Sequence, residues 1–281
     1  MSENSTNTKK GMSAMKILLS IIVVALVGGL SAGDLEISGD YVVSPDGESY
    51  GSVSVIGNAN ITGGPLTLAD GGAIVISSGK SATFACTVSL GQNAGDSVSI
   101  APASDATALF TGKITGPADI FISAADKTGT VRFAPASGVT SDFDGNLSVI
   151  RGTFRAKGDS ALGSTVGTTT CISTKTGDVY DNFIYFEGME TAETLWLSRG
   201  DIGWSKVDTI LFTGDCTFNG PICAPSPKKE FGWNFKTGIT LTFNGGLGSQ
   251  DKPYENSWVP NRALRTSCSI RRRLSKPHGI G

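Results

Sequence analysis

Short runs in which every second residue is apolar fill most of this chain, and they constrain its fold more than any other feature. Examples are "SVSVIG" (52–57), "SATFACTVSLG" (81–91), "GTVRFAP" (129–135) and "GITLTFNGG" (238–246). Strict alternation with β-branched and aromatic residues is typical of strands that bury one face. Gly, Asn, Asp and Pro bound the runs and favour turns. Outside the N-terminal segment 1–32 no stretch shows helical periodicity, so the body is predicted to be all-β.

Two all-β architectures fit this pattern, namely a sandwich or barrel and a stacked solenoid. Uniform strand length, the 37 Gly residues and the lack of tight hairpins with long matched arms favour the solenoid. In a parallel β-helix the inward side chains of each coil pack on those of the next, while outward positions are free to be polar. We therefore predict a right-handed, single-stranded parallel β-helix over residues 33–250, with about 20–25 residues per coil.

The N-terminal segment 1–32 differs from the rest of the chain. Lys9, Lys10 and Lys16 precede an uncharged apolar run from Ile17 to Leu30, which "SAG" follows. A basic start, a short apolar middle and small residues at the exit are typical of a secretory signal peptide. The run is short for a membrane span, which needs about 20 apolar residues. Export is therefore predicted, with contact to a membrane only through this segment if it is retained as an anchor.

Charge is unevenly distributed along the chain. Of the 23 basic residues, six lie in 262–281 and three in 1–32, and of the 25 acidic residues one lies in 1–32. Residues 33–261 therefore carry a net charge of −10, which argues against nucleic-acid binding. The basic segment 251–281 has two interpretations. It is either an arm for an anionic partner or an irregular, disordered or truncated end, and the loss of apolar periodicity favours the second.

Cysteine and histidine chemistry is limited in this sequence. The five cysteines (Cys86, Cys171, Cys216, Cys223 and Cys268) are too few for a disulfide-stapled fold and odd in number, although Cys216 and Cys223 are near enough in sequence to pair. The only histidine is His278, and no CxxC occurs. We therefore expect no zinc site, no other metal and no cofactor.

The stretch 141–164, "SDFDGNLSVIRGTFRAKGDSALGS", allows two interpretations. Asp142, Asp144 and Asn146 provide oxygen ligands at alternate positions, as a calcium loop does. An EF-type loop, however, needs Gly at its sixth position and Glu at its twelfth, and both are missing. Asp and Asn also stabilise turns by binding nearby backbone groups. We therefore favour a polar corner between two strands, with Phe143 packed beneath it.

Residues 111–164 also resemble a known family, the autotransporter-associated β-strand repeat. The residues that match its strands, corner and closing turn are Gly129, Thr130, Val131, Phe143, Gly145, Leu147 to Val149, Gly152, Thr153, Phe154, Ala161, Leu162 and Gly163. The resemblance implies a passenger-type parallel β-helix displayed at, or released from, a bacterial surface. Ser141, Asp142, Asp144 and Asn146 depart from the family pattern. The set of alternating strands expected for a membrane barrel is not found between Gly245 and Gly281, so self-translocation is not supported.

Parallel β-helices also host polysaccharide lyases and hydrolases, so an enzyme has to be considered. Such chemistry needs clustered carboxylates, and the body has no histidine. The candidate acids are scattered (Asp142, Asp144, Asp178, Asp181, Glu187, Glu190, Asp201 and Asp208). Arg151, Arg155 and Lys157 alternate outward, either along a sugar groove or on a solvated sheet face whose charges oppose aggregation. The sequence identifies no catalytic residue.

The segment 180–218 departs most from the repeat style because it is rich in aromatic residues. Aromatic side chains either stack on sugars and anchor partners or fill a wider coil. As candidate ligand-binding residues we take Tyr185, Trp196, Trp204 and Trp233. The sequence thus predicts a secreted or cell-surface, structural or adhesin-like protein whose partners are surface glycans or proteins of host or neighbouring cells. The alternatives are a carbohydrate-active enzyme that uses carboxylates, and a trimeric fibre.

Overall fold

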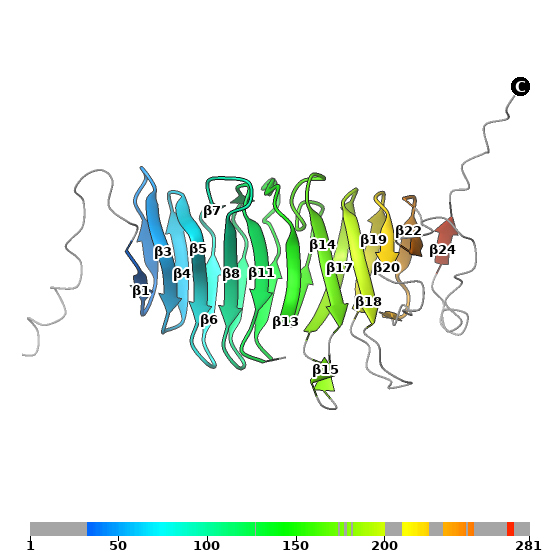
Figure 1. The fold of residues 1–281 in the computed structure, drawn as a ribbon, viewed down its shortest axis with the longest axis horizontal. Coiled ribbons are helices and arrows are strands. Elements are labelled where there is room, and N and C mark those ends of the chain that lie inside the picture. Colours follow the sequence, from blue (N-terminus) through cyan, green and yellow to red (C-terminus); the bar gives the residue numbers. More distant parts are fainter. Residues whose placement is uncertain are drawn as a thin grey trace, which may run out of the picture. The chain divides into compact units, whose positions relative to one another are not determined.

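The strands of this protein stack as a parallel β-solenoid. The computed structural model describes residues 33–126, 128–173, 175–176, 179–180, 182–199, 210–224, 233–245, 247–249 and 269–272. Residues Ala32–Gly281 form one compact unit. Figure 1 shows its coils following one another in chain order, from β1 to the C-terminal strands.

Each coil contributes up to three strand segments, and these define three faces. The first face contains β1 (Leu35–Ile37), the ends of β3 (Glu48–Val55) and β5 (Leu66–Ile76), β8 (Ser97–Pro102), β11 (Asp119–Ser123), the start of β13 (Leu147–Ala156), β14 (Thr168–Ser173), β18 (Thr194–Arg199), β20 (Ile222–Ala224) and β23 (Leu247–Ser249). The second face contains β2 (Tyr41–Val43), β4 (Ala59–Gly63), β6 (Ser81–Phe84), β9 (Thr107–Phe110), β12 (Thr130–Phe133), the end of β13, the starts of β17 (Asn182–Thr191) and β19 (Ile210–Phe218), and β21 (Trp233–Phe235). The third face contains the starts of β3 and β5, β7 (Val88–Leu90), β10 (Ile114–Thr115), the ends of β17 and β19, β22 (Thr240–Phe243) and β24 (Ser269–Arg272).

All pairings between coils are parallel, as the alternating runs predict. The length of chain from one coil to the next varies: a short step leads from Leu35 to its partner Val53, and a long one from Gly152 to its partner Asn182. The range is wider than the sequence predicted because the turns differ in length. The step from Gly152 contains the antiparallel hairpin of β15 (Lys175–Thr176) and β16 (Val179–Tyr180), which projects from the row of coils in Figure 1.

Glycine allows the long strands to bend from one face to the next. In β13, Gly152 has φ +97° and lies between the first-face and second-face segments. A Cβ at this position would lie 2.4 Å from the Cβ of Ala124 in the preceding coil. Only glycine adopts this left-handed conformation without strain, and here it also prevents a clash. The bend turns Thr153 and Arg155 outward on the second face while Phe154 packs inside.

The inward residues form one continuous apolar core, which includes two groups of phenylalanines. On the second face Phe84 stacks on Phe110 with ring centroids 4.7 Å apart, and Phe133 follows edge-on at 5.1 Å. In the next coil Ala156 occupies the position that pairs with Phe133. The aromatic ring there comes from Phe154, and its centroid lies 5.0 Å from that of Phe133. A second group then begins, with Phe186, Phe212, Phe218 and Phe243 at centroid distances of 5.2–5.8 Å. Such ring pairs add about 0.5–1.5 kcal/mol each beyond the burial of their area.

Polar side chains occupy inward positions of the first coil. Tyr41 pairs in register with buried Ile61, and Glu48 and Tyr50 pair with buried Leu66 and Leu68. Glu48 Oε2 accepts hydrogen bonds from the hydroxyls of Tyr41 and Tyr50 at 2.5 and 2.8 Å, and Oε1 accepts one from the Ser44 amide at 2.9 Å. Terminal coils of solenoids need a polar outer surface over their core. This Tyr41–Glu48–Tyr50 cluster provides one at the first described coil.

Aspartate and asparagine side chains join neighbouring coils at the corners. Asp119 Oδ1 accepts hydrogen bonds from the backbone and side-chain nitrogens of Asn146, and Asn146 Oδ1 accepts them from the backbone and hydroxyl of Thr168. Asp40, Asn58, Asp70, Asp159 and Asp215 each accept a hydrogen bond from a backbone amide of the following coil in the same way. These five aspartates therefore have a structural role, because their carboxylates satisfy backbone amides of the next coil.

The prediction of an all-β parallel solenoid is confirmed, and the described residues contain no helix. Among these residues no helix is long and apolar enough to cross a membrane. The right-handed sense of the coils stays a prediction, and the expected signal peptide (1–32) lies outside the described residues. Within the segment 251–281, β24 pairs with β22, and the other residues of that segment also lie outside the described part of the chain.

Candidate functional site

The polar corner at 141–146 is held together by contacts between coils. Lys113 Nζ lies 2.7 Å from Asp142 Oδ2, and Asp144 Oδ1 accepts a hydrogen bond of 2.6 Å from the Ser164 hydroxyl. Asn146 binds Asp119 and Thr168, so the three candidate ligands have separate partners. Burial favours the neutral form of Asp142, but hydrogen bonds from Lys113 and Thr115 outweigh this and lower the pKa of its carboxyl.

This arrangement agrees with the corner interpretation rather than the calcium loop. Phe143 is 1% exposed beneath the corner, as predicted, and its ring centroid lies 6.1 Å from that of Phe133. A Cβ on Gly145 would lie 1.9 Å from the Ala118 carbonyl oxygen, so this turn needs glycine. Within the described ranges no group of three or more His, Cys, Asp or Glu side chains is placed to hold a metal ion.

Within the described part of the chain, a cluster of charged and aromatic side chains lies on the second face, across β12, β13 and β17. Arg132, Arg155 and Tyr185 occupy the same outward register on these three neighbouring strands. Glu187 is the next outward residue of β17, and its side chain is 13% exposed. We call these four residues the Arg–Tyr patch. They are brought together by the stacking of three coils, although Arg132 and Glu187 are far apart in sequence.

Glu187 orients both arginines of the patch. Arg132 donates to Glu187 Oε2 from Nε at 2.9 Å and from Nη2 at 2.5 Å. Arg155 Nη1 lies 3.4 Å from Glu187 Oε1, and the Arg155 guanidinium carbon lies 4.6 Å from the centroid of the Tyr185 ring. A cation over an aromatic face contributes about 0.5–1 kcal/mol at exposed sites. One carboxylate thus faces two guanidinium groups, which leaves the patch with one positive charge.

The patch is the centre of a local concentration of basic residues. The segment 33–261 has four arginines, and three of them (Arg132, Arg151 and Arg155) lie on β12 and β13. Arg151 and Lys157 are exposed at the two ends of the second-face part of β13. These basic side chains are therefore clustered on two neighbouring strands of a segment that is acidic overall.

The structure separates the aromatic residues that the sequence suggested as ligand-binding. Tyr185 lies in the Arg–Tyr patch on the second face, whereas Trp196 lies on the first face, where it pairs in register with Thr170 and Cys223. Both side chains are partly exposed. Trp204 lies outside the described residues, and of Trp233 only the backbone, in β21, is described. The two described residues therefore do not form one site.

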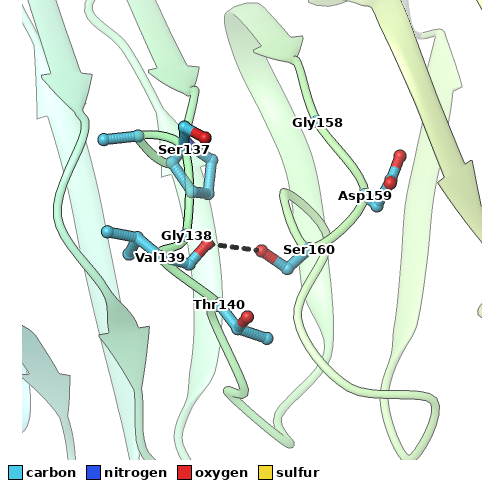
Figure 2. Close-up of a pocket in the computed structure, with 9 residues that line it drawn as sticks. Ser137, Gly138, Val139, Thr140, Gly158, Asp159 and Ser160 are labelled. Carbon is cyan, nitrogen blue, oxygen red and sulfur yellow. Dashed lines mark hydrogen bonds between the residues drawn. The ribbon is translucent and has the colours of Figure 1, made fainter.

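A shallow hollow lies between two turns that leave the second face, 135–140 and 158–160, and it has a volume of about 390 Å³. Figure 2 shows Ser160 facing the Val139 carbonyl, to which its hydroxyl donates at 3.5 Å. Asp159 is the one carboxylate among the lining residues, and it points away from the 137–140 turn. Its Oδ1 accepts a hydrogen bond from the Glu190 amide at 2.8 Å. This hollow has no carboxylate pair for acid–base work on a sugar.

The cysteines do not provide a nucleophile in the described part of the chain. Cys86, Cys171, Cys216 and Cys223 are free and buried, so the suggested Cys216–Cys223 disulfide is not present. Burial raises the pKa of the Cys86 and Cys216 thiols to about 11 and that of Cys171 to about 12. A neutral, buried thiol is unreactive, so these residues are packing residues.

Sequence reasoning identified Arg155, Tyr185 and Glu187 separately but missed Arg132 and the contacts among the four. The signal for Arg132 was its outward position in "GTVRFAP". Of the other candidate acids, Glu190 accepts a hydrogen bond from Asn219 Nδ2 at 2.7 Å, and Asp178, Asp181, Asp201 and Asp208 lie outside the described residues.

Comparisons of this chain with known proteins find no matching family model, no matching curated protein and no matching solved structure.

Proposed function

We propose that this chain is an exported bacterial solenoid, secreted or held at the cell surface, with an adhesive or structural role and no catalytic activity. We propose further that it binds acidic glycans through the Arg–Tyr patch. The apolar N-terminal segment supports export, and the resemblance of 111–164 to the autotransporter-associated β-strand repeat supports display at a surface. A solenoid suits such a role, because its stacked coils present a long and rigid surface.

The observation that carries the binding proposal is the position of Arg155. Its guanidinium is held between the Tyr185 ring and Glu187 Oε1, on a strand paired on both sides. A guanidinium has five N–H donors, and the 3.4 Å ion pair engages the group at one edge. The remaining donors match the bidentate geometry of a carboxylate or sulfate. Little side-chain entropy is lost on binding, because the group is already oriented.

The surroundings of the patch favour a glycan over a protein partner. The outward neighbours Thr130 and Thr153 are polar residues beside the two arginines. Protein interfaces usually have an apolar core that becomes fully buried. Of the described large apolar residues with the greatest exposure, Ile150 lies in β13 before Arg151, and the others lie outside the three strands of the patch (Val42, Ile56, Val75 and Val166). Binding of nucleic acid depends on neutralising many phosphates, whereas the patch carries one net positive charge.

The carboxylates described near the patch do not favour the alternative of a glycan-cleaving enzyme. Both carboxylate oxygens of Glu187 are engaged by arginine side chains, so neither is directed at a substrate. Asp159, in the nearby hollow, is hydrogen-bonded to a backbone amide. Hydrolysis would need two carboxyl groups about 5–9.5 Å apart on either side of the scissile bond.

The proposal is tested by binding of the full chain to immobilised polygalacturonate, with dextran as the neutral glycan. We expect binding to polygalacturonate only, with Arg155→Ala weakening it about tenfold because charge-assisted hydrogen bonds are lost. Tyr185→Ala should also weaken binding, but by less. It removes the ring that orients the Arg155 guanidinium and leaves the positive charge in place.

Lys113→Ala is the matched control, because it removes one positive charge at a corner, where Lys113 is paired with Asp142. This variant should bind as the unchanged protein does. Equal loss in Lys113→Ala and Arg155→Ala would mean that only net charge matters and would reject the patch. Equal binding to dextran would reject acidic specificity, and release of new reducing ends or unsaturated products would establish the enzyme instead.

A further inference from the structure

A polar pair lies inside the core on the first face, and it has no role in the proposed function. The inward column of this face runs through Ile120, Leu147, Thr169, Leu195 and Ile222. Thr169 is the one polar residue among these five, and it is fully buried. Its hydroxyl donates a hydrogen bond of 3.0 Å to Oε1 of Glu193. An aliphatic column has thus been interrupted to accommodate a carboxyl group.

Glu193 is almost completely buried and only partly satisfied. Its exposed fraction is 1%, and Oε2 has no hydrogen-bond partner among the described residues. Gly167 and Gly220 occupy the same register in the two neighbouring coils, two residues before Thr169 and Ile222. A Cβ on Gly220 would lie 2.3 Å from the Glu193 carbonyl oxygen, so the coils are in close contact at this corner. A charged carboxylate in such a place is costly unless several donors surround it.

We propose that the Thr169–Glu193 pair makes the stacking of β14, β17 and β18 dependent on pH, so that these coils are held firmly in acid and loosened in alkali. The geometry provides the two states. Protonated Glu193 is a neutral group that fits an apolar core. In ionised Glu193, Oε1 accepts a hydrogen bond from the Thr169 hydroxyl, but Oε2 has no donor among the described residues. Ionisation therefore favours opening of the corner, where water can solvate the carboxylate.

The groups around Glu193 do not compensate its charge. The Thr169 hydroxyl faces it from β14, the Thr191 hydroxyl accepts a hydrogen bond from its backbone nitrogen at 3.1 Å, and the Gly220 backbone approaches from the next coil. Cys171, two residues further along the inward side of β14, is also buried, and burial raises the pKa of its thiol to about 12, so it stays neutral. None of these described neighbours provides a positive charge.

The direction of the pH effect follows from proton linkage. Burial raises the pKa of Glu193 from 4.5 to about 8, and the hydrogen bond from Thr169 offsets only part of this shift. In the unfolded chain the carboxyl ionises near its ordinary value, so between about pH 4.5 and pH 8 the folded state binds more protons than the unfolded state. Stability contributed by this group therefore falls as the pH rises through that window and is constant above it.

The test is the thermal unfolding midpoint of the full chain from pH 4.5 to pH 9, compared with Glu193→Gln. The amide of glutamine does not ionise, so the variant should resemble the protonated wild type. We expect similar midpoints near pH 4.5 and a variant more stable by roughly 5–10 °C at pH 9. The matched control is Glu36→Gln, the same change at an exposed glutamate, and its curve should run parallel to that of the wild type.

Parallel curves for the wild type and Glu193→Gln would overturn the proposal. If Glu193→Gln does not fold, hydrogen exchange of the wild type decides the matter. After correction for intrinsic exchange, protection of the β14 and β18 amides should decrease between pH 5 and pH 8 relative to that of β5 and β8, which lie far from Glu193 in the stack of coils. Equal change in both regions would also reject a local effect.

Discussion

Among the described residues two glutamates are on the inward side of the solenoid, one in the first described coil and one directly before β18, and their environments are opposite. Glu48 receives three hydrogen bonds, from two tyrosine hydroxyls and one amide, and these outweigh burial and lower the pKa of its carboxyl. Glu193 receives one side-chain hydrogen bond, and burial raises the pKa of its carboxyl to about 8. An inward position therefore does not determine the charge of a carboxyl group. The number of donors around it does.

The two regions also differ in what lies beyond the polar group. The Tyr41–Glu48–Tyr50 cluster lies in the first described coil, and its three residues are partly exposed. Thr169 and Glu193 have coils on both sides and no comparable exposure. Water can solvate a charged group in the first coil, but it does not reach the buried carboxyl group of Glu193. We therefore expect substitutions to have smaller and less pH-dependent effects in the first coil than near β18.

The largest effect is expected for Thr169→Val at alkaline pH. The valine fits the aliphatic column but leaves ionised Glu193 without a donor, which should lower the free energy of unfolding by about 2–3 kcal/mol at pH 9. At pH 5, where the carboxyl is neutral, the loss should be less than half as large. Urea denaturation at both pH values measures the difference.

Thr170→Val provides the control for that experiment, because Thr170 is the next residue of β14 and faces outward. The same chemical change there should alter stability by less than about 0.5 kcal/mol at either pH. A loss in Thr169→Val that does not depend on pH would show that Glu193 is not ionised in alkali. The contrast between the two glutamates would then disappear.

An intermediate effect is expected for Glu48→Ala. The change removes the acceptor of three donors, and we expect a loss of about 1–2 kcal/mol at pH 7, reduced because the tyrosines are partly exposed and can bind water instead. Glu48→Gln should lose less than Glu48→Ala. The stabilising effect of Glu48 is fully present above its ordinary pKa of 4.5 and should disappear as the pH falls through its lower folded value.

This dependence on pH is opposite in sign to that expected for Glu193, so the two variants test the comparison directly. Unfolding of the wild type and Glu48→Gln in urea at pH 3 and pH 7 should show the larger difference at pH 7. A larger difference at pH 3 would mean that the first coil holds a protonated glutamate, as the β18 region does.

The smallest effect is expected for Asp119→Ala, at a corner on the outside of the solenoid. Asp119 accepts two hydrogen bonds from Asn146, but water can replace it there. We expect a loss of about 0.5–1 kcal/mol in urea denaturation at pH 7. A loss as large as that of Thr169→Val at pH 9 would show that the corner contacts are as isolated from water as the buried pair.

The fold was predictable because its main determinant is local. Alternation in runs such as "SATFACTVSLG" defines the inward side of each strand, and Phe84 and Leu90 are buried as that pattern predicts. Phe143 and Gly145 were also assigned correctly, because turn chemistry depends on a few adjacent residues. For Asp142 and Asp144, the sequence could not show which side chains bind their carboxylates, because these partners come from other coils. The calcium loop therefore remained an alternative to the polar corner.

The contacts between coils were not predictable, because the length of each turn sets the register. Arg132 meets Glu187 across a sequence separation of 55 residues, and a shift of one residue in the register of β17 would place another side chain opposite Arg132. The same reason explains why Tyr185 and Trp196 were grouped although they lie on different faces. The Thr169–Glu193 pair had only a weak signal, a threonine in an inward strand position and a glutamate beside a turn.

The chain of hydrogen bonds from Asp119 through Asn146 to Thr168 bears on how a protein of this kind can change its length. Each of these three side chains binds the residue at the equivalent position of a neighbouring coil, so the link continues over three coils. A duplication or loss of one complete coil would rejoin two compatible corners and keep the inward residues inward. Gain or loss of a single residue within a strand would instead turn its apolar side chains outward. Growth by whole units is therefore the route that this architecture leaves open to evolution and to protein engineering.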